Sequence, residues 1–330
     1  MIAFVKSDLL GKSIRKSWNF TKGGQAMNGI LPLYKPRGMT SQACDAKLRY
    51  LLHTRRVGHG GTLDPNVDGV LPICIGPATK VVDYLVAGGK TYQGEVTLGF
   101  ATTTEDLDGE VVATTPLSSK FTDEQIDNQM QLLTGDLVQT PPKYSAVKVN
   151  GRRLYDYARA GESVKRPQRQ VTITKFKRLD QPKFDAEKGI QKFHFEVCCS
   201  KGTYIRTLAV DLGRKLGVAA VMSELTRTIS GGFTLADTVD LATVAQLSAT
   251  QQIGKVLQPL EIALADFPKI NLTQQQWEKV QHGAFLERQR LTALNQTVAL
   301  VYAGKVKALY QPHQRYPHLL RPVKMFLQNV

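Results

Sequence analysis

The sequence predicts an α+β protein with a mixed, largely antiparallel sheet and a small β-rich C-terminal domain. Residues 91–100 alternate, with Tyr92, Val96 and Leu98 on one side and polar residues on the other, and residues 193–199 alternate in the same way. Both patterns are typical of half-buried strands. Helical patterns stand between the strands without a regular βαβ rhythm, which argues against a doubly wound parallel sheet.

The helices are predicted from their first and last residues and from their apolar spacing. We expect helices over residues 41–52, 79–88, 122–135 and 205–217. Ser41 and Thr79 are the expected caps of the first two, Thr122 with Gln125 forms a capping box for the third, and Gly217 ends the fourth. Residues 106–109, DLDG, are expected to form a turn.

Changes of composition divide the 330 residues into parts. Residues 1–26 are polar and basic without an apolar period, and we expect a disordered arm with no secretory signal. A first domain is expected over 27–260, with a basic and aromatic excursion at about 143–169. Short apolar runs over 267–330 predict the β-rich second domain.

Charge is unevenly distributed along the chain. There are 43 Lys and Arg against 28 Asp and Glu, a formal charge of +15. Eleven basic residues and two acids lie between 143 and 178, and seven basic residues and no acid follow Glu287, whereas 105–136 holds eight acids and one Lys. Two basic clusters suit a polyanionic partner such as RNA, DNA or an anionic membrane surface. A merely solvated basic surface is the alternative.

Several classes of protein are excluded by composition and motifs. No apolar stretch is long enough for a membrane helix, and four cysteines without a CxxC pair suit neither a disulfide scaffold nor a zinc site. Residues 58–62, GHGGT, lack the Lys of a phosphate-binding loop, and no two His lie four residues apart. We therefore expect a cytoplasmic protein with no cofactor and no metal, whose chemistry uses carboxylate, tyrosine and arginine.

Three segments could carry that chemistry. Residues 60–65, GGTLDP, let the backbone approach a ligand and hold Asp64 in a turn made rigid by Pro65. Residues 201–206, KGTYIR, join a strand to a helix, and residues 35–41, KPRGMTS, precede a helix. Taken one at a time, each segment could equally be an ordinary turn.

Together these segments resemble the bacterial TruB family of tRNA pseudouridine synthases. The resemblance extends in order from Met27 to about Leu260 and weakly into the C-terminal domain. Its motifs are GIL at 29–31, KPxG at 35–38, GHxGxLDP at 58–65, GxLP at 69–72, KxY at 90–92, DxxG at 106–109, SKGTYIR at 200–206 and LxRT at 225–228. It implies a pseudouridine synthase catalytic domain and a PUA-like C-terminal domain.

The resemblance also implies an activity and its residues. The family isomerises uridine 55 in the TΨC loop of tRNA, a reaction that needs neither a redox agent nor ATP. Asp64 is the catalytic carboxylate, and the residues implied to bind substrate are His59, Tyr92, Tyr204, Arg206 and Leu225. The residues implied to support the site are Lys35, Pro36, Gly38, Asp106 and Arg227.

In this interpretation each role has a physical reason. Arg206 would keep Asp64 ionised and oriented, with Asp106 anchoring Arg206. Tyr92 would stack on the extruded base. His59 would hold the RNA loop, Tyr204 would lie near the base or sugar as a late proton carrier, and Leu225 would help exclude water. For Tyr92 and Leu225, ordinary core packing is the alternative.

The expected partner is the TΨC arm and acceptor stem of tRNA, bound by a monomer without an obligate protein partner. Two other functions stay open: a tRNA-folding chaperone, or the same chemistry on another RNA. The sequence departs from the family where Thr103 replaces an acid, Val221 replaces a His, and Thr226 stands where Arg is common. These departures concern contacts around the site and not Asp64.

Overall fold

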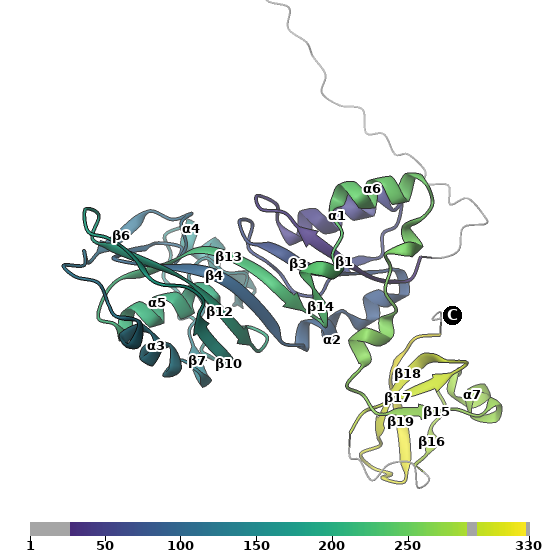
Figure 1. Ribbon diagram of the computed structural model, residues 1–330. Helices are drawn as coiled ribbons and strands as arrows, with labels where there is room; N and C mark the ends of the chain where they lie inside the picture. Colours follow the sequence, from purple (N-terminus) through teal and green to yellow (C-terminus); the bar gives the residue numbers. More distant parts are fainter. Residues whose placement is uncertain (1–26, 289–295, 328–330) are drawn as a thin grey trace, which may run out of the picture.

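The computed structural model describes residues 27–288 and 296–327 and confirms the α+β class. Figure 1 shows an elongated molecule with two lobes that share one long twisted sheet, and a smaller β-rich unit beside the second lobe. The predicted arm at 1–26 lies outside the described residues. None of the described helices is long and apolar enough to cross a membrane.

The shared sheet has the strand order β1-β3-β13-β4-β12-β10-β7, with β2, β11 and β14 pairing at its margins. Its strands are β1 (Gly29–Lys35), β2 (Val57–His59), β3 (Asp68–Ile75), β4 (Lys90–Leu98), β7 (Gly135–Gln139), β10 (Arg169–Arg178), β11 (Lys183–Asp185), β12 (Ile190–Cys199), β13 (Ala220–Ser230) and β14 (Phe233–Thr234). All its ladders are antiparallel except the short pairing of β3 with β13. Two small hairpins lie outside it: β5 (Phe100–Thr102) with β6 (Val111–Thr114), and β8 (Lys148–Val149) with β9 (Arg152–Arg153).

The helices are short. They are α1 (Ser41–Leu51), α2 (Val82–Ala87), α3 (Asp123–Gln131), α4 (Leu154–Arg159), α5 (Ile205–Lys215), α6 (Leu241–Ala249) and α7 (Gln274–Val280), with 3₁₀ turns η1 (Gly76–Val81), η2 (Leu235–Asp237), η3 (Ile253–Lys255) and η4 (Leu260–Leu264). In the first lobe α3 and α5 cover one face of the sheet, and in the second lobe α1 and α6 lie together (Figure 1).

Two expected helix caps are wrong, and two helix ends are confirmed. The side chain that caps α1 is that of Thr40, which accepts a hydrogen bond from the main-chain nitrogen of Ala43, because Ser41 is buried and bonded elsewhere. Thr79 lies inside η1 and donates to a main-chain oxygen. The Thr122 capping box and the left-handed Gly217 after α5 are as predicted.

The parallel pairing of β3 with β13 in the shared sheet joins the two lobes and requires a glycine. Gly69 of β3 lies opposite Arg227 of β13, with φ of 107°. A Cβ added there would lie 2.2 Å from the main-chain oxygen of Arg227. Only glycine lets the two strands approach this closely, and their pairing sets the position of Arg227.

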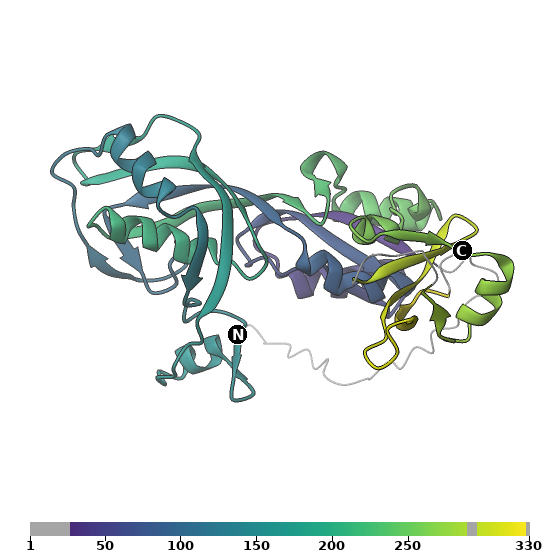
Figure 2. The same cartoon turned by 90° about the horizontal axis from the view of Figure 1, so that it is seen from below.

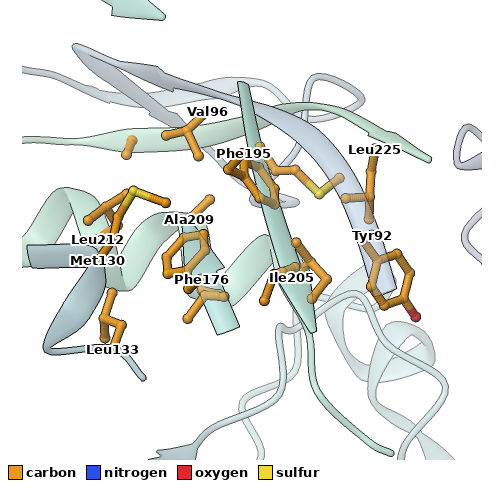
Figure 3. Close-up of a cluster of buried hydrophobic side chains, with 14 of the residues drawn as sticks. Tyr92, Val96, Met130, Leu133, Phe176, Phe195, Ile205, Ala209, Leu212 and Leu225 are labelled. Carbon is orange, nitrogen blue, oxygen red and sulfur yellow. The ribbon is translucent and has the colours of Figure 1, made fainter. Parts of the chain in front are cut away.

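The first lobe has one large apolar core between the sheet and the helices α3 and α5. Its members include Val96, Met130, Phe195 and Leu212 (Figure 3). Tyr92 and Leu225 lie at its edge, and the hydroxyl of Tyr92 points away from the apolar side chains. The edge of this core is therefore where the functional cavity begins.

The C-terminal sheet has the order β15-β17-β18-β19-β16. Its strands are β15 (Lys269–Asn271), β16 (Leu286–Glu287), β17 (Val298–Tyr302), β18 (Lys305–Pro312) and β19 (Leu319–Met325). It packs directly on the second lobe, because Leu309 and Phe326 belong to the same buried cluster as Ile30 and Leu85. The β-rich character is as predicted, while the exact domain boundaries stay a prediction.

The basic excursion near 143–169 stands away from the first lobe (Figure 2). It contains β8, β9 and α4, and Leu154 is its buried apolar anchor. Arginine–tyrosine contacts occur within it, and the guanidinium of Arg152 lies 4.5 Å from the ring centroid of Tyr157. Arg152 also forms an ion pair with Glu162 at 2.7 Å. Exposed ion pairs of this kind contribute little to stability, so the buried Leu154 is the main apolar contact of the segment.

Candidate active site

A cavity of about 230 Å³ opens at the edge of the first-lobe core. It lies between the 61–64 loop, the 200–206 segment, β4 and β13, so four of the sequence-predicted motifs meet there: GHxGxLDP, KxY, SKGTYIR and LxRT. Its lining residues are Gly61, Thr62, Leu63, Asp64, Val67, Val86, Lys90, Tyr92, Ser145, Ala146, Ser200, Lys201, Gly202, Thr203, Tyr204, Ile205, Arg206, Leu225 and Arg227.

Asp64 is paired with a buried guanidinium. The Nε atom of Arg206 lies 3.0 Å from a carboxylate oxygen of Asp64 and 3.5 Å from one of Asp106. The Asp64 side chain is 43% exposed, whereas that of Arg206 is 6% exposed. One carboxylate is thus presented to the cavity by a cation that solvent hardly reaches.

The remaining nitrogens of Arg206 fix it in place. One donates to the main-chain oxygen of Thr104 at 2.8 Å and the other to that of Tyr144 at 3.1 Å. Burial raises the pKa of Asp106, against the opposing effects of its hydrogen bond from Thr104 and of Arg206. Arg206 therefore joins the 61–64 loop, the 104–106 turn and the start of the basic excursion.

Three buried side chains hold the main chain around Asp64. The hydroxyl of Ser41 accepts from the nitrogen of Leu63 at 2.9 Å and donates to its oxygen at 3.2 Å. Lys35 Nζ donates to the oxygen of Pro65 at 2.9 Å, and an Arg227 nitrogen donates to that of Gly61 at 3.0 Å. The loop is thus held at Gly61, Leu63 and Pro65, on both sides of Asp64. Such an arrangement would preorganise a reacting carboxylate.

Tyr92 and Leu225 form an apolar wall of the cavity. They lie on the neighbouring strands β4 and β13, and both are buried. Gly94 permits their packing, since a Cβ there would lie 2.9 Å from a Leu225 methyl carbon and 2.3 Å from the Glu224 oxygen. Burial raises the pKa of Tyr92, so its phenol stays neutral.

Tyr204 lies at the opposite side of the cavity and its backbone is fixed. The Gln139 side chain accepts from the Tyr204 nitrogen at 3.0 Å and donates to its oxygen at 3.2 Å. The Arg169 guanidinium lies 5.4 Å from the Tyr204 ring centroid. Tyr204 is half-buried and is among the residues that line the cavity.

Five of the sequence-predicted residues do not line the cavity: His59, Lys35, Pro36, Gly38 and Asp106. His59 lies beside it: Nδ1 is 2.9 Å from Asp45 and Nε2 is 3.1 Å from the hydroxyl of Thr62, which does line it. Pro36 accepts from Lys35 Nζ through its main-chain oxygen, and Gly38 takes a left-handed φ of 78° in the turn before α1. The role of His59 with RNA stays a prediction.

Sequence reasoning missed the roles of Ser41, Lys90 and Glu105. Lys90 lines the cavity, and burial, reinforced by Arg227, lowers its pKa to about 8. Glu105 accepts from the Thr207 hydroxyl at 2.7 Å, and burial raises its pKa. The KxY motif contains Lys90 and was a usable signal, but Ser41 and Glu105 act through contacts distant in sequence.

The structure accounts for the departures from the family pattern. Thr226 donates to Asp68 at 2.6 Å, and Tyr34 and Arg37 also contact that carboxylate, so the hydroxyl has a defined partner. Val221 is fully buried in β13. Thr103 packs close to Gly109, where a Cβ would lie 2.6 Å from the Thr103 hydroxyl oxygen. None of the three lines the cavity.

Among the described residues, no three His, Cys, Asp or Glu side chains are grouped so as to hold a metal ion. At the cavity, Asp64 is paired with Arg206, and Arg206 and Arg227 also donate to main-chain oxygens.

Comparisons with known proteins agree with this geometry. Residues 49–205 match the N-terminal domain of TruB family pseudouridylate synthases, and 206–265 match the C-terminal domain of tRNA pseudouridylate synthase B. The tRNA pseudouridine synthase B of Lactiplantibacillus plantarum is 55% identical over 310 residues, which cover 92% of this chain and 100% of that protein. That of Levilactobacillus brevis is 56% identical over 304 residues, with the same coverage.

A solved structure shares the fold. A chain of a crystallised Cbf5-Nop10-Gar1 complex superposes with a TM-score of 0.67 at 24% identity, covering 94% of this chain and 92% of that chain. At this identity the likeness concerns the fold alone. From the matched domains and the close relatives, the chain belongs to the TruB family of pseudouridylate synthases.

Proposed function

We propose that this protein converts uridine 55 in the TΨC loop of tRNA to pseudouridine, without a cofactor. One observation carries the proposal: a partly exposed Asp64 is held by the buried Arg206 in a cavity with Tyr92 on its wall. Close relatives are named tRNA pseudouridine synthase B, which supports tRNA as the substrate.

The chemistry rearranges bonds within one nucleotide. The C1′–N1 bond breaks and its electron pair leaves with the uracil, while an Asp64 oxygen bonds to C1′ or stabilises its positive charge. The base turns, C5 bonds to C1′ as the carboxylate is released, and the C5 proton is lost while N1 gains one. Atoms and electrons balance within the substrate, so the reaction needs one well-placed carboxylate and no oxidant.

The walls of the cavity suit an extruded base. A target base inside a folded loop must leave its stack to be reached, and an aromatic ring restores part of the lost stacking energy. In our proposal Tyr92 provides that ring, and Leu225 helps exclude water from C1′ of the ribose while the glycosidic bond is broken. Tyr204 lies near the base or sugar and carries a proton late in the reaction. His59, which is hydrogen-bonded to Thr62, borders the RNA loop that enters the cavity in this proposal.

The basic surface fits the rest of the tRNA. We propose that the excursion at 143–169 grips the TΨC arm and that the C-terminal domain touches the acceptor stem. Recognition would rest on RNA shape and on a splayed-out base. We further propose that the protein works in the cytoplasm as a monomer.

The test is to map pseudouridine in tRNA after reaction with the wild-type protein and with Asp64→Asn. We expect modification at uridine 55 only with the wild type, and tRNA binding by the variant within a few fold. Turnover by the variant would refute the role of Asp64. Modification of a different uridine or RNA would support the alternative substrate, and tRNA refolding without any modification would support a chaperone.

A further inference from the structure

The charge of the cavity exceeds what Asp64 needs. Among the described residues that line it, one is an acid, Asp64, and four are cations: Lys90, Lys201, Arg206 and Arg227. Arg206 is accounted for by Asp64 and Asp106. Lys201 is exposed at the rim. The presence of the other two cations, Lys90 and Arg227, at the cavity is not explained by Asp64.

Lys90 and Arg227 are buried cations without an acidic partner among the described residues. They are 7% and 1% exposed. Lys90 Nζ donates to main-chain oxygens at the end of α2, at 2.6 Å to Val86 and also to Gly88. Arg227 donates to the oxygens of Val70 at 2.8 Å and Gly61 at 3.0 Å. Carbonyl dipoles orient both charges but do not neutralise them, and burying such charges is costly.

The strand register places both cations beside Tyr92. Arg227 of β13 lies directly opposite Tyr92 of β4. Lys90 and Tyr92 are two residues apart on β4, and Leu225 and Arg227 are two apart on β13, so all four share one face of the sheet. Each of them lines the cavity. A base stacked on Tyr92 would therefore have the two buried cations at its edge.

We infer that Lys90 and Arg227 stabilise the uracil anion that leaves when the glycosidic bond breaks. This inference rests on the proposed function. When C1′–N1 breaks, the electron pair goes to N1 and the negative charge spreads to the base oxygens O2 and O4. That charge is consumed when C5 bonds to C1′. The C5 proton then leaves while N1 gains one, with no net change of charge. Fixed positive charge in a water-poor site stabilises such a transient anion most strongly.

Phosphate binding is the competing role for two cations, and their position disfavours it. A phosphodiester stays at the surface, where the exposed Lys201 lies, whereas Lys90 and Arg227 lie beside the wall that receives the base. A phosphate role predicts weaker RNA binding on substitution. A leaving-group role predicts a slower cleavage step whose size depends on the base.

The experiment compares two otherwise identical TΨC-arm RNAs that carry uridine or 5-fluorouridine at the target position. Fluorine stabilises negative charge on the departing base, so less help is needed from the protein. Single-turnover consumption of the target nucleotide is measured for the wild type, Lys90→Met and Arg227→Gln. We expect a ~10²-fold loss on uridine, a smaller loss on 5-fluorouridine, and little change in RNA affinity.

Two further variants serve as controls. Lys201→Met removes a rim cation, and we expect weaker RNA binding with equal rate losses on both bases. Arg227→Lys keeps the charge but cannot hold both the Val70 and Gly61 oxygens, so its loss should also be equal on both bases. A urea-unfolding midpoint for each variant identifies any that does not fold, and Lys90→Met gives the same test independently of Arg227→Gln.

The outcomes are distinct. Equal losses on the two bases for both Lys90→Met and Arg227→Gln would overturn the inference. So would weaker RNA binding with an unchanged single-turnover rate, which would instead indicate a phosphate contact. If the wild type makes no pseudouridine from the uridine RNA, the proposed function itself fails, which is a separate result.

Discussion

Replacement of Ser41 by Ala tests whether the main chain around Asp64 must be held in place. Ser41 is 1% exposed, and its hydroxyl bonds both the nitrogen and the oxygen of the buried Leu63, the residue before Asp64. Alanine leaves both main-chain groups without this partner. At ~1–3 kcal/mol for each buried group, and less where water enters, we expect a loss of about 2–4 kcal/mol in the free energy of unfolding.

The neighbouring residue gives a matched control. Thr40 caps α1 by accepting from Ala43 at 3.0 Å, so Thr40→Ala should cost about 1 kcal/mol of stability and leave turnover unchanged. Ser41→Ala should also slow pseudouridine formation by ~10–100-fold, because a displacement of ~1 Å at the reacting group has effects of this size.

Two measurements check this prediction. Urea unfolding gives the stabilities, and tritium release from tRNA labelled at C5 of uridine gives the single-turnover rate at saturating enzyme. The reasoning is refuted if Ser41→Ala loses stability but reacts at the wild-type rate, since the hydroxyl would then support the fold without positioning the catalytic loop. Equal rate losses in Thr40→Ala and Ser41→Ala would refute it too.

Three further predictions concern pH, salt and packing. Burial lowers the pKa of Lys90 from 10.5 to about 8. Between pH 8 and 10.5 the unfolded chain therefore binds more protons than the folded one, and the free energy of unfolding rises with pH. Lys90→Met should remove this rise, as measured by urea-unfolding midpoints across that pH range. The affinity for tRNA should fall steeply with salt, with a log–log slope of several units by filter binding, and a flat response would exclude the two basic clusters as the footprint. Gly94→Ala places a Cβ 2.3 Å from the Glu224 oxygen and 2.9 Å from Leu225, and should lower both the unfolding temperature and the turnover rate; wild-type values for both would contradict the close packing of this wall.

Local patterns predicted local structure well. The alternation in β4 and β12, the Thr122 capping box and the glycine after α5 are each determined within a few residues, and each is confirmed. The cap of α1 is different, because both Thr40 and Ser41 are residue types that cap helices. The decision between Thr40 and Ser41 depends on a bond to Leu63, which is 22 residues away and invisible to a local pattern.

The site was predicted through motifs and completed by long-range contacts. The GGTLDP and KGTYIR segments do meet at one cavity, and the pairing of Asp64 with Arg206 is present as expected. The burial of Lys90 and Arg227 follows from the β4–β13 register and from the parallel pairing at Gly69. Basic side chains are mostly exposed in proteins, so the burial of these two could not be predicted from composition.

The C-terminal sheet is joined to the second lobe through a common buried cluster and not by a linker alone. Leu309 and Phe326 pack with Ile30 and Leu85, Lys80 donates to the Met325 oxygen at 2.7 Å, and Tyr84 contacts Phe267 edge-on. This packing sets the distance between the C-terminal sheet and the candidate site. In the proposed function, an RNA could contact both only if the distance between its reactive loop and its stem end matches that separation.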